Sequence, residues 1–219
     1  PGSPAASPLN AILGFSQLLE LDPTIGAHQQ QWVQQVLQGG RHLLDLMDDI
    51  LDLSSAQTGQ LSMNIEVQPL RPVVAEVCAM FELPARQAGV DLIDEVPVYG
   101  LPCVQADRRR LKQVLSNLIS NAIKYNRAGG WVRIGAQQDG DQLAITVADN
   151  GPGLSAEQQA RLFRPFERLG AQRGSVAGTG LGLALARELA EAMAGTLAVR
   201  SAPGAGATFE LRLLSAART

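Results

Sequence analysis

At 219 residues, the chain is long enough for one ordinary domain and a smaller appendage. Hydrophobic residues make up 46% of it and charged residues 18%, a balance typical of a soluble globular protein with a sizeable core. The formal net charge of −3 argues against general nucleic-acid binding, which favours a basic surface.

The two cysteines indicate the redox state of the compartment in which the protein works. Cys78 and Cys103 lie in stretches that resemble a buried helix and a buried strand, without metal-ligand spacing. This usage favours a reducing, cytoplasmic setting, or the cytoplasmic portion of a membrane sensor. No stretch is apolar for long enough to cross a bilayer and no signal peptide is visible, so we expect no membrane contact from this chain.

Two amphipathic helices are predicted at the N-terminus. Apolar residues recur at helical spacing from Leu9 to Leu19, and Asp22-Pro23 ends the run. A longer apolar stripe extends from Trp32 to Leu51 and stops near Gly59. Because two such helices cannot bury their apolar faces alone, we expect pairing with a second copy in a four-helix bundle. The alternative is a hairpin that packs on its own domain.

The rest of the chain mixes helix and strand patterns. Asp107 is the expected N-cap of a helix whose apolar positions include Leu111, Leu115 and Leu118. A further helix is predicted over 70–87, and strands over 61–67, 91–96, around 104, 131–135, 143–147, 196–201 and 208–214.

The predicted fold class is α+β. A helical hairpin over residues 1–59 is followed by an α/β sandwich over residues 60–219, in which three helices cover one face of a mixed sheet.

The first chemical motif is the turn Asp149-Asn150-Gly151-Pro152-Gly153. It follows the alternating strand 143–147, so the carboxylate of Asp149 lies at a strand end, where it can accept a hydrogen bond from an exocyclic amine. Gly151 and Gly153 allow positive φ and remove the Cβ atoms that would keep a flat heterocycle away. Taken alone, the motif also fits an ordinary turn.

A second glycine-rich turn, Gly178-Thr179-Gly180-Leu181-Gly182, opens a helix predicted over 181–194. The unpaired N–H groups and positive dipole end of that helix form a site for phosphate, and Thr179 can add a hydroxyl donor. A dinucleotide-binding loop needs a strand directly before the first glycine, whereas 171–177 is predicted to be a loop.

Polar residues share one face of the helix that begins after Asp107. Asn117, Asn121 and Lys124 are spaced by four and three. The amide oxygen of Asn121 suits Mg²⁺, which takes a few protein oxygens together with phosphate oxygens. Lys124 either reaches phosphate as a point charge or is a solvated helix lysine. Tyr125 lines a base pocket or belongs to the core.

An aromatic pair precedes the second glycine-rich turn. Phe163 and Phe166 bracket Pro165 and lead into a loop that contains several glycines. This pattern suits a lid that orders over a bound triphosphate, with Arg168 as a phosphate contact, although packing alone also explains the phenylalanines.

Taken in chain order, the helix segment 117–126, the Asp149 turn, the segment 163–168 and the turn 178–183 resemble the N, G1, F and G2 boxes of sensor histidine kinases, and the resemblance extends from about Ser7 to the last strand. That family shares its ATP-binding (Bergerat) fold with gyrase and Hsp90. The resemblance implies ATP and Mg²⁺ as cofactors, Asn121 as the metal ligand, and transfer of the γ-phosphate to a histidine and on to a response-regulator aspartate. The implied ATP-binding residues are Asn117, Asn121, Lys124, Tyr125, Asp149, Gly151, Gly153, Phe166, Arg168, Gly178, Thr179, Gly180, Leu181 and Gly182.

The resemblance also implies partners: a second copy through the helical hairpin, a response-regulator receiver domain, and a sensor domain outside this chain. The N-terminus departs from the family pattern. The family reads His-Glu-Leu-Arg-Thr-Pro before Leu-Asn, whereas this chain has Ser3-Pro4-Ala5-Ala6-Ser7-Pro8 before Leu9-Asn10. Ser3 thus occupies the acceptor-histidine position, and a phosphoserine ester is too stable to pass its phosphate on.

His28 and His42 do not match the acceptor position and are interpreted as structural. We therefore predict ATP binding without autophosphorylation by the usual route. Two alternatives remain. One is a degenerate signalling protein that binds ATP and regulates a partner kinase or response regulator. The other is a gyrase- or Hsp90-like ATPase, which is disfavoured because such proteins need a transducer domain and this chain ends soon after Leu214.

Overall fold

The computed structural model describes residues 6–100, 103–167 and 179–216. The chain divides into two compact units, Pro1–Asp52 and Leu53–Thr219, which are described separately. The domain boundary between residues 59 and 60 stays a prediction. None of the helices in the described ranges is long and apolar enough to cross a membrane.

The first unit is a helical hairpin, as predicted. Helix α1 spans Ala6–Glu20 and α2 spans Ala27–Gln57. The turn between them is ordered by Asp22, whose Oδ1 accepts hydrogen bonds from the N–H and the hydroxyl of Thr24 at 2.8 and 2.7 Å. The small core of the hairpin consists of the buried Leu9, Leu13 and Leu37, with Val33, Leu44 and Met47 packed against it.

The second unit is built on a mixed sheet. Its strands are β1 (Glu66–Gln68), β2 (Val90–Asp94), β3 (Cys103–Ala106), β4 (Gly130–Asp139), β5 (Gln142–Asp149), β6 (Thr196–Ser201) and β7 (Ala207–Ala216). Their order is β1-β3-β7-β5-β4-β2, and β6 also pairs with β7. Strands β2 and β4 are parallel, whereas the other pairs are antiparallel.

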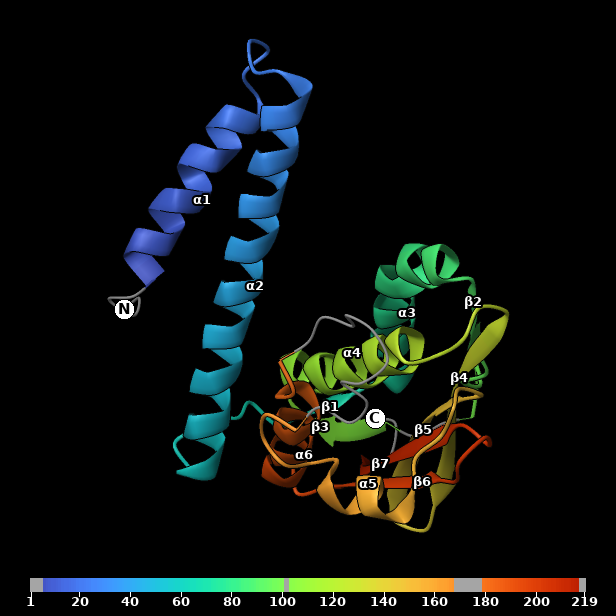
Figure 1. Ribbon diagram of the computed structural model, residues 1–219. Helices are drawn as coiled ribbons and strands as arrows, with labels where there is room; N and C mark the ends of the chain where they lie inside the picture. Colours follow the sequence, from blue (N-terminus) through green and yellow to red (C-terminus); the bar gives the residue numbers. More distant parts are fainter. Residues whose placement is uncertain (1–5, 101–102, 168–178, 217–219) are drawn as a thin grey trace. The chain divides into compact units, whose positions relative to one another are not determined.

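Three helices cover one face of this sheet (Figure 1): α3 (Leu70–Ala88), α4 (Arg108–Lys124) and α6 (Gly182–Ala192). Helix α4 packs between α3 and α6 and against β4 and β5. Its apolar residues recur three and four positions apart and are buried, which explains its central place. The predicted N-cap is confirmed, because Oδ1 of Asp107 accepts the N–H of Arg110 at 3.1 Å.

The strand predicted over 61–67 is wrong for its first five residues. Only Glu66–Gln68 forms a strand, β1, because its partner β3 is short and pairs with these three residues alone. A short helix, α5 (Ala156–Arg161), was not predicted. Helix α4 begins with three arginines, Arg108–Arg110, of which Arg110 is only 8% exposed and donates to Oε1 of Gln113 at 2.9 Å.

Candidate nucleotide-binding site

Asp149 is the last residue of the central strand β5, between Val132 of β4 and Ala207 of β7. Its carboxylate is half-buried, and Oδ1 accepts the N–H of Gly151 at 2.8 Å. Burial raises the pKa of the Asp149 carboxyl above its usual value, opposed by the N–H groups of Gly151 and Ala207. The strand end therefore presents a partly desolvated acid at one edge of the sheet.

The two glycines after Asp149 serve different needs. Gly153 has a φ of 67°, whereas Gly151 does not have positive φ. A Cβ atom at Gly151 would lie 2.8 Å from Oδ1 of Asp149 and 3.2 Å from the carbonyl oxygen of Tyr125. Glycine at 151 thus allows the turn to lie against the C-terminal end of α4.

Two asparagines connect this turn to the neighbouring elements. Nδ2 of Asn126, just after α4, donates to the carbonyl of Trp131 at 3.0 Å. The N–H of Trp131 donates to Oδ1 of Asn150 at 2.7 Å. The end of α4, the start of β4 and the Asp149 turn are therefore held together by side-chain amides.

The polar face of α4 also contacts the start of α6. Nδ2 of Asn117 donates to the carbonyl of Gly182 at 3.0 Å, and a Cβ atom at Gly182 would lie 3.4 Å from Oδ1 of Asn117. Asn121 is half-buried one turn further along α4. Helix α4 thus brings two predicted segments together, the second glycine-rich turn beside Asn117 and the Asp149 turn beside Tyr125.

Of the two interpretations of Tyr125, the structure excludes a place in the core, because the side chain is 43% exposed. The ammonium group of Lys124 lies 5.3 Å from the centroid of the Tyr125 ring, a distance at which a cation and a ring attract each other.

Phe166 is joined to the second glycine-rich turn through its backbone. Its N–H donates to the carbonyl of Gly180 at 3.0 Å, and it has a φ of 64°, which is uncommon for a residue other than glycine. The Phe166 side chain is 65% exposed, so core packing does not account for it. Phe163 is half-buried, with the guanidinium of Arg187 5.5 Å from its ring centroid.

The start of α6 has the general features of an anion site. Oγ1 of Thr179 accepts the N–H of Leu181 at 3.1 Å, and the first N–H groups of the helix that begins at Gly182 have no intrahelical acceptors, as at any helix N-terminus. No acidic side chain lies in the first turn of α6 to oppose its positive end. Arg168, Gly178 and the rest of the expected lid over 168–178 lie outside the described residues, as does Ser3.

Two family models match the chain. The model for histidine kinase-, DNA gyrase B- and HSP90-like ATPases matches residues 106–217, and the His Kinase A (phospho-acceptor) domain model matches residues 7–59. The chain belongs to the sensor histidine kinase family. The resemblance expected from the sequence and the α+β fold class are thus confirmed.

Curated relatives carry histidine kinase and sensor names. The virulence sensor protein BvgS of Bordetella bronchiseptica is 38% identical over 212 residues, which cover 94% of this chain and 17% of that protein. The histidine protein kinase DivJ of Caulobacter vibrioides is 37% identical over 209 residues, which cover 94% of this chain and 35% of that protein. The chain thus spans well under half the length of these relatives.

Solved histidine kinase structures have the same fold. Full-length ShkA in complex with AMPPNP superposes with a TM-score of 0.84 at 31% identity, covering 97% of this chain and 44% of that one. The histidine kinase AdeS of Acinetobacter baumannii gives a TM-score of 0.69 at 26% identity, covering 96% of this chain and 97% of that one.

Within this histidine kinase fold, the sequence reasoning missed residues that support the site without belonging to a recognised box. Asn126 and Asn150 directly follow Tyr125 and Asp149, and that adjacency was the available signal. Ser201 and Gly206 are far from the boxes in sequence, and Gln159 lies between the Asp149 turn and Phe163 without belonging to either motif, so none of the three gave a local signal.

Proposed function

We propose that this chain is the ATP-binding catalytic module of a two-component sensor histidine kinase, attached to a dimerisation hairpin. The observation that carries the proposal is the meeting of three segments: the Asp149 strand end, the asparagine face of α4 and the N-terminus of α6. The AMPPNP in the ShkA complex, a structural relative, supports a nucleotide as ligand.

Each part of ATP has a matching group in this arrangement. The carboxylate of Asp149 would accept the exocyclic amine of adenine, with Gly151 and Gly153 allowing the base to approach the backbone. The N–H groups of Gly182 and Leu183, in the first turn of α6, and the hydroxyl of Thr179 would bind phosphates. Tyr125 would flank the base. Lys124 would add positive charge near the phosphates. We propose that Arg168 and Gly178, which lie outside the described residues, also contact the phosphates.

The oxygen ligands that the protein offers fit Mg²⁺ only when the ion is bound together with a nucleotide. Within the described ranges, no group of three or more His, Cys, Asp or Glu side chains could hold a metal ion. Mg²⁺ commonly keeps phosphate oxygens and waters and takes few ligands from the protein, so the amide oxygen of Asn121 is a sufficient protein ligand. When bound, the ion would neutralise phosphate charge beside α4.

In the intact family reaction, the γ-phosphoryl group leaves ATP for a histidine nitrogen, ADP is released, and the group then passes to a response-regulator aspartate. We propose that this chain supplies the ATP site for that reaction but does not phosphorylate itself, because Ser3 stands at the acceptor position. The partners we propose are a second copy through the hairpin and a receiver domain, in the cytoplasm; the match of residues 7–59 to the phospho-acceptor model supports the role of the hairpin.

Calorimetric titration of the chain with ATP and Mg²⁺ tests nucleotide binding. Asp149→Asn should weaken ATP binding roughly ten- to hundredfold, because an amide cannot replace a carboxylate acceptor of two donors. Asp141→Asn, an exposed aspartate in the turn between β4 and β5, is the matched control and should bind as the wild type does. Absence of binding to the wild type contradicts the proposal.

The missing acceptor histidine favours a second candidate function, a regulator of a partner kinase or response regulator. Incubation with radiolabelled ATP separates the two. We expect no acid-labile, base-stable phosphoprotein from this chain alone. If label appears on a partner kinase only when both proteins are mixed, the regulatory function is supported; label on this chain alone would overturn the prediction of no autophosphorylation.

A further inference from the structure

The turn that carries Asp149 rests on the hairpin between β6 and β7 through one hydroxyl group. Oγ of Ser201, the last residue of β6, accepts the N–H of Leu154 at 2.8 Å. The same hydroxyl donates to the carbonyl of Gly206 at 2.6 Å. Ser201 therefore bridges the end of the Asp149 turn and the far side of the hairpin.

The backbones of the two turns fit closely. The N–H of Gly204 donates to the carbonyl of Pro152 at 2.7 Å. A Cβ atom at Gly153 would collide with the carbonyl oxygen of Ala202, and one at Gly206 with the carbonyl oxygen of Asp149. Glycine at 153 and 206 is thus required for contact between the turns, so the hairpin limits where the Asp149 turn can lie.

Gln159 of α5 ties a third segment into this contact. Its Nε2 lies 2.9 Å from the carbonyl oxygen of Ser201 and 3.1 Å from that of Leu154. The start of α5 is fixed by a capping box in which Ser155 accepts from the N–H of Gln158 at 3.2 Å and donates its own N–H to the Gln158 side chain at 2.8 Å. Helix α5 then leads to Phe166, whose N–H bonds to Gly180.

We propose that Ser201 and Gln159 are positioning residues for the nucleotide. Neither side chain lies among the groups assigned to ATP; they act by fixing the 149–154 turn against the hairpin and against the segment that leads to Phe166. A turn containing two glycines loses much conformational freedom when it is ordered. If the protein orders it in advance, nucleotide binding does not bear that cost. This inference rests on the proposed ATP-binding function.

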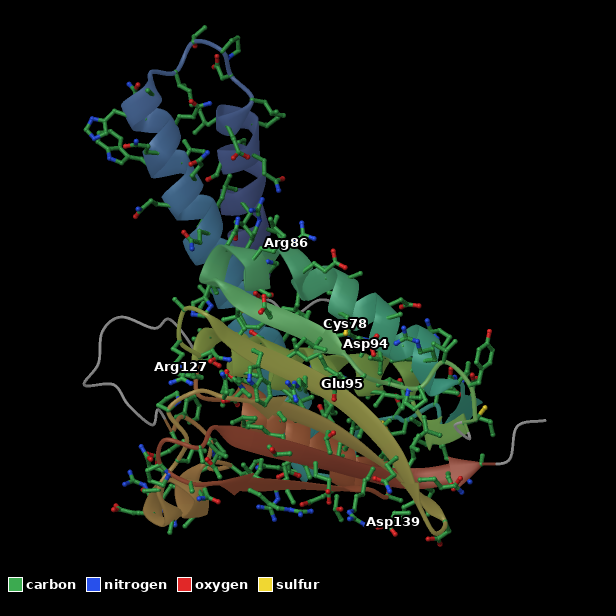
Figure 2. All side chains as sticks on the ribbon, turned by 90° about the vertical axis from the view of Figure 1, so that its right-hand side faces the viewer. Cys78, Arg86, Asp94, Glu95, Arg127 and Asp139 are labelled. Carbon is green, nitrogen blue, oxygen red and sulfur yellow. The ribbon has the colours of Figure 1, made fainter. Side chains whose placement is uncertain are left out.

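Ser201→Ala removes both hydrogen bonds of the bridge and should weaken ATP binding about three- to tenfold, because only the bond to Leu154 holds the Asp149 turn directly. Ser201→Thr keeps the hydroxyl and should restore most of the affinity. The matched control is Ser215→Ala, because Ser215 also lies on a hairpin and donates to a carbonyl, that of Asp141, at 2.9 Å. Figure 2 shows Asp139, the last residue of β4 and close in sequence to Asp141, far from Arg127, which precedes the other end of β4 near the Asp149 turn.

A double-mutant cycle distinguishes a positioning role of Ser201 from a general loss of stability. In an Asp149→Asn background, Ser201→Ala should cost less than about twofold, because the turn no longer holds the carboxylate that benefits from being positioned. Gln159→Met, which keeps the side-chain length but removes the amide, should weaken binding in the same way. An equal fold-change for Ser201→Ala in both backgrounds overturns the proposal.

Amide hydrogen exchange without nucleotide keeps this inference separate from the proposed function. Ser201→Ala should speed exchange at Leu154 and Gly151 but not in strands β4 and β7, and Ser215→Ala should leave both amides unchanged. Unchanged exchange at Leu154 in Ser201→Ala contradicts the positioning role. A wild type that fails to bind ATP, with the expected exchange pattern, contradicts the ATP-binding function and not the fixation of the turn.

Discussion

The helical hairpin and the sheet unit differ in how completely they bury their apolar side chains. In the sheet unit, the large apolar residues of α4, β5 and β7 that face the core are almost entirely buried. In the hairpin, three leucines form the buried core, while Phe15 is 69% exposed and Trp32 59% exposed. The sheet unit also exposes some large apolar residues, such as Leu83 and Tyr99, but beside a large buried core, whereas the buried core of the hairpin is small. The hairpin therefore leaves the larger share of its apolar side chains for contact with a partner.

This difference separates two kinds of contribution to a sensor kinase. Nucleotide binding would depend on contacts inside the sheet unit, because all described residues assigned to ATP lie there. The apolar surface of α1 and α2 would serve assembly with a second copy, as the match of residues 7–59 to the phospho-acceptor domain suggests. Each prediction below tests one side of this separation.

The largest effect is expected in the core of the sheet unit. Leu118→Ala, at a fully buried position of α4, should lower the free energy of unfolding by about 2–5 kcal/mol, because it removes buried methyl groups and leaves a cavity. Leu83→Ala, at an exposed position of α3, is the matched control and should change stability by less than about 0.5 kcal/mol. Urea unfolding followed by circular dichroism measures both, and equal losses would mean that the core is not where the structure puts it.

A charge on the exposed face of the hairpin should act on assembly instead. Phe15→Glu places a carboxylate on the surface proposed to contact the second copy, so the chain should become monomeric at concentrations where the wild type is dimeric. Gln17→Glu adds the same charge at an exposed polar position of α1 and should keep the dimer.

Light scattering after gel filtration gives the mass of each variant, and calorimetry gives ATP affinity per chain. Affinity should be unchanged in Phe15→Glu. A dimer that persists in this variant would exclude the α1 face around Phe15 as the interface.

The parts of the structure that the sequence predicted are those encoded by local periodicity and capping. Helix α4 was predicted with its buried face and its Asp107 cap, because both signals lie within a few turns of chain. Strand β1 was predicted too long because strand length depends on the partner, and β3 offers pairing to Glu66–Gln68 only. Helix α5, with six residues, is too short for a periodic pattern to reveal.

The same distinction holds for the site. Asp149 and Gly180 were selected because glycine spacing within a few residues signals a functional turn. The bridge from Ser201 to Leu154 spans 47 positions, and the bond from Gln159 to Ser201 spans 42, so neither is visible in any local window. Support for a binding turn comes from residues that the fold brings together, and sequence patterns alone do not show which ones meet.

A smaller effect is expected in the pH dependence of the stability of the hairpin. Burial, with repulsion from Asp45, Asp52 and Asp48, raises the pKa of Asp49 from 3.8 to about 6. Because a raised pKa means that the folded hairpin binds this proton more tightly than the unfolded chain, hairpin stability should rise as pH falls from above 6 towards 4. Asp49→Asn should remove this dependence and stabilise the hairpin at pH 7 by roughly 1 kcal/mol, a figure reduced for the partial exposure of Asp49.

Trp32 fluorescence in a Trp131→Phe background reports hairpin unfolding selectively, because the chain has two tryptophans. Asp48→Asn is the control: Asp48 is exposed and ranks last among the charges that raise the pKa of Asp49, so its replacement should have the smaller effect. If the stability of the wild-type hairpin falls as the pH is lowered from 7 to 5, the raised pKa of Asp49 is contradicted.

The smallest change is expected when the hairpin is removed. A fragment of residues 60–219 should fold and bind ATP within about twofold of the full chain, because the described contacts around Asp149, Asn117 and Gly182 all lie inside it. The fragment 53–219 is the matched comparison, since the compact sheet unit begins at Leu53 and the predicted boundary lies at residue 60. Equal binding by both fragments would support the boundary at 60, whereas binding by the longer fragment alone would move the boundary to the end of α2. Loss of binding in both would mean that the hairpin contributes to the nucleotide site, and the separation between assembly and binding would be wrong.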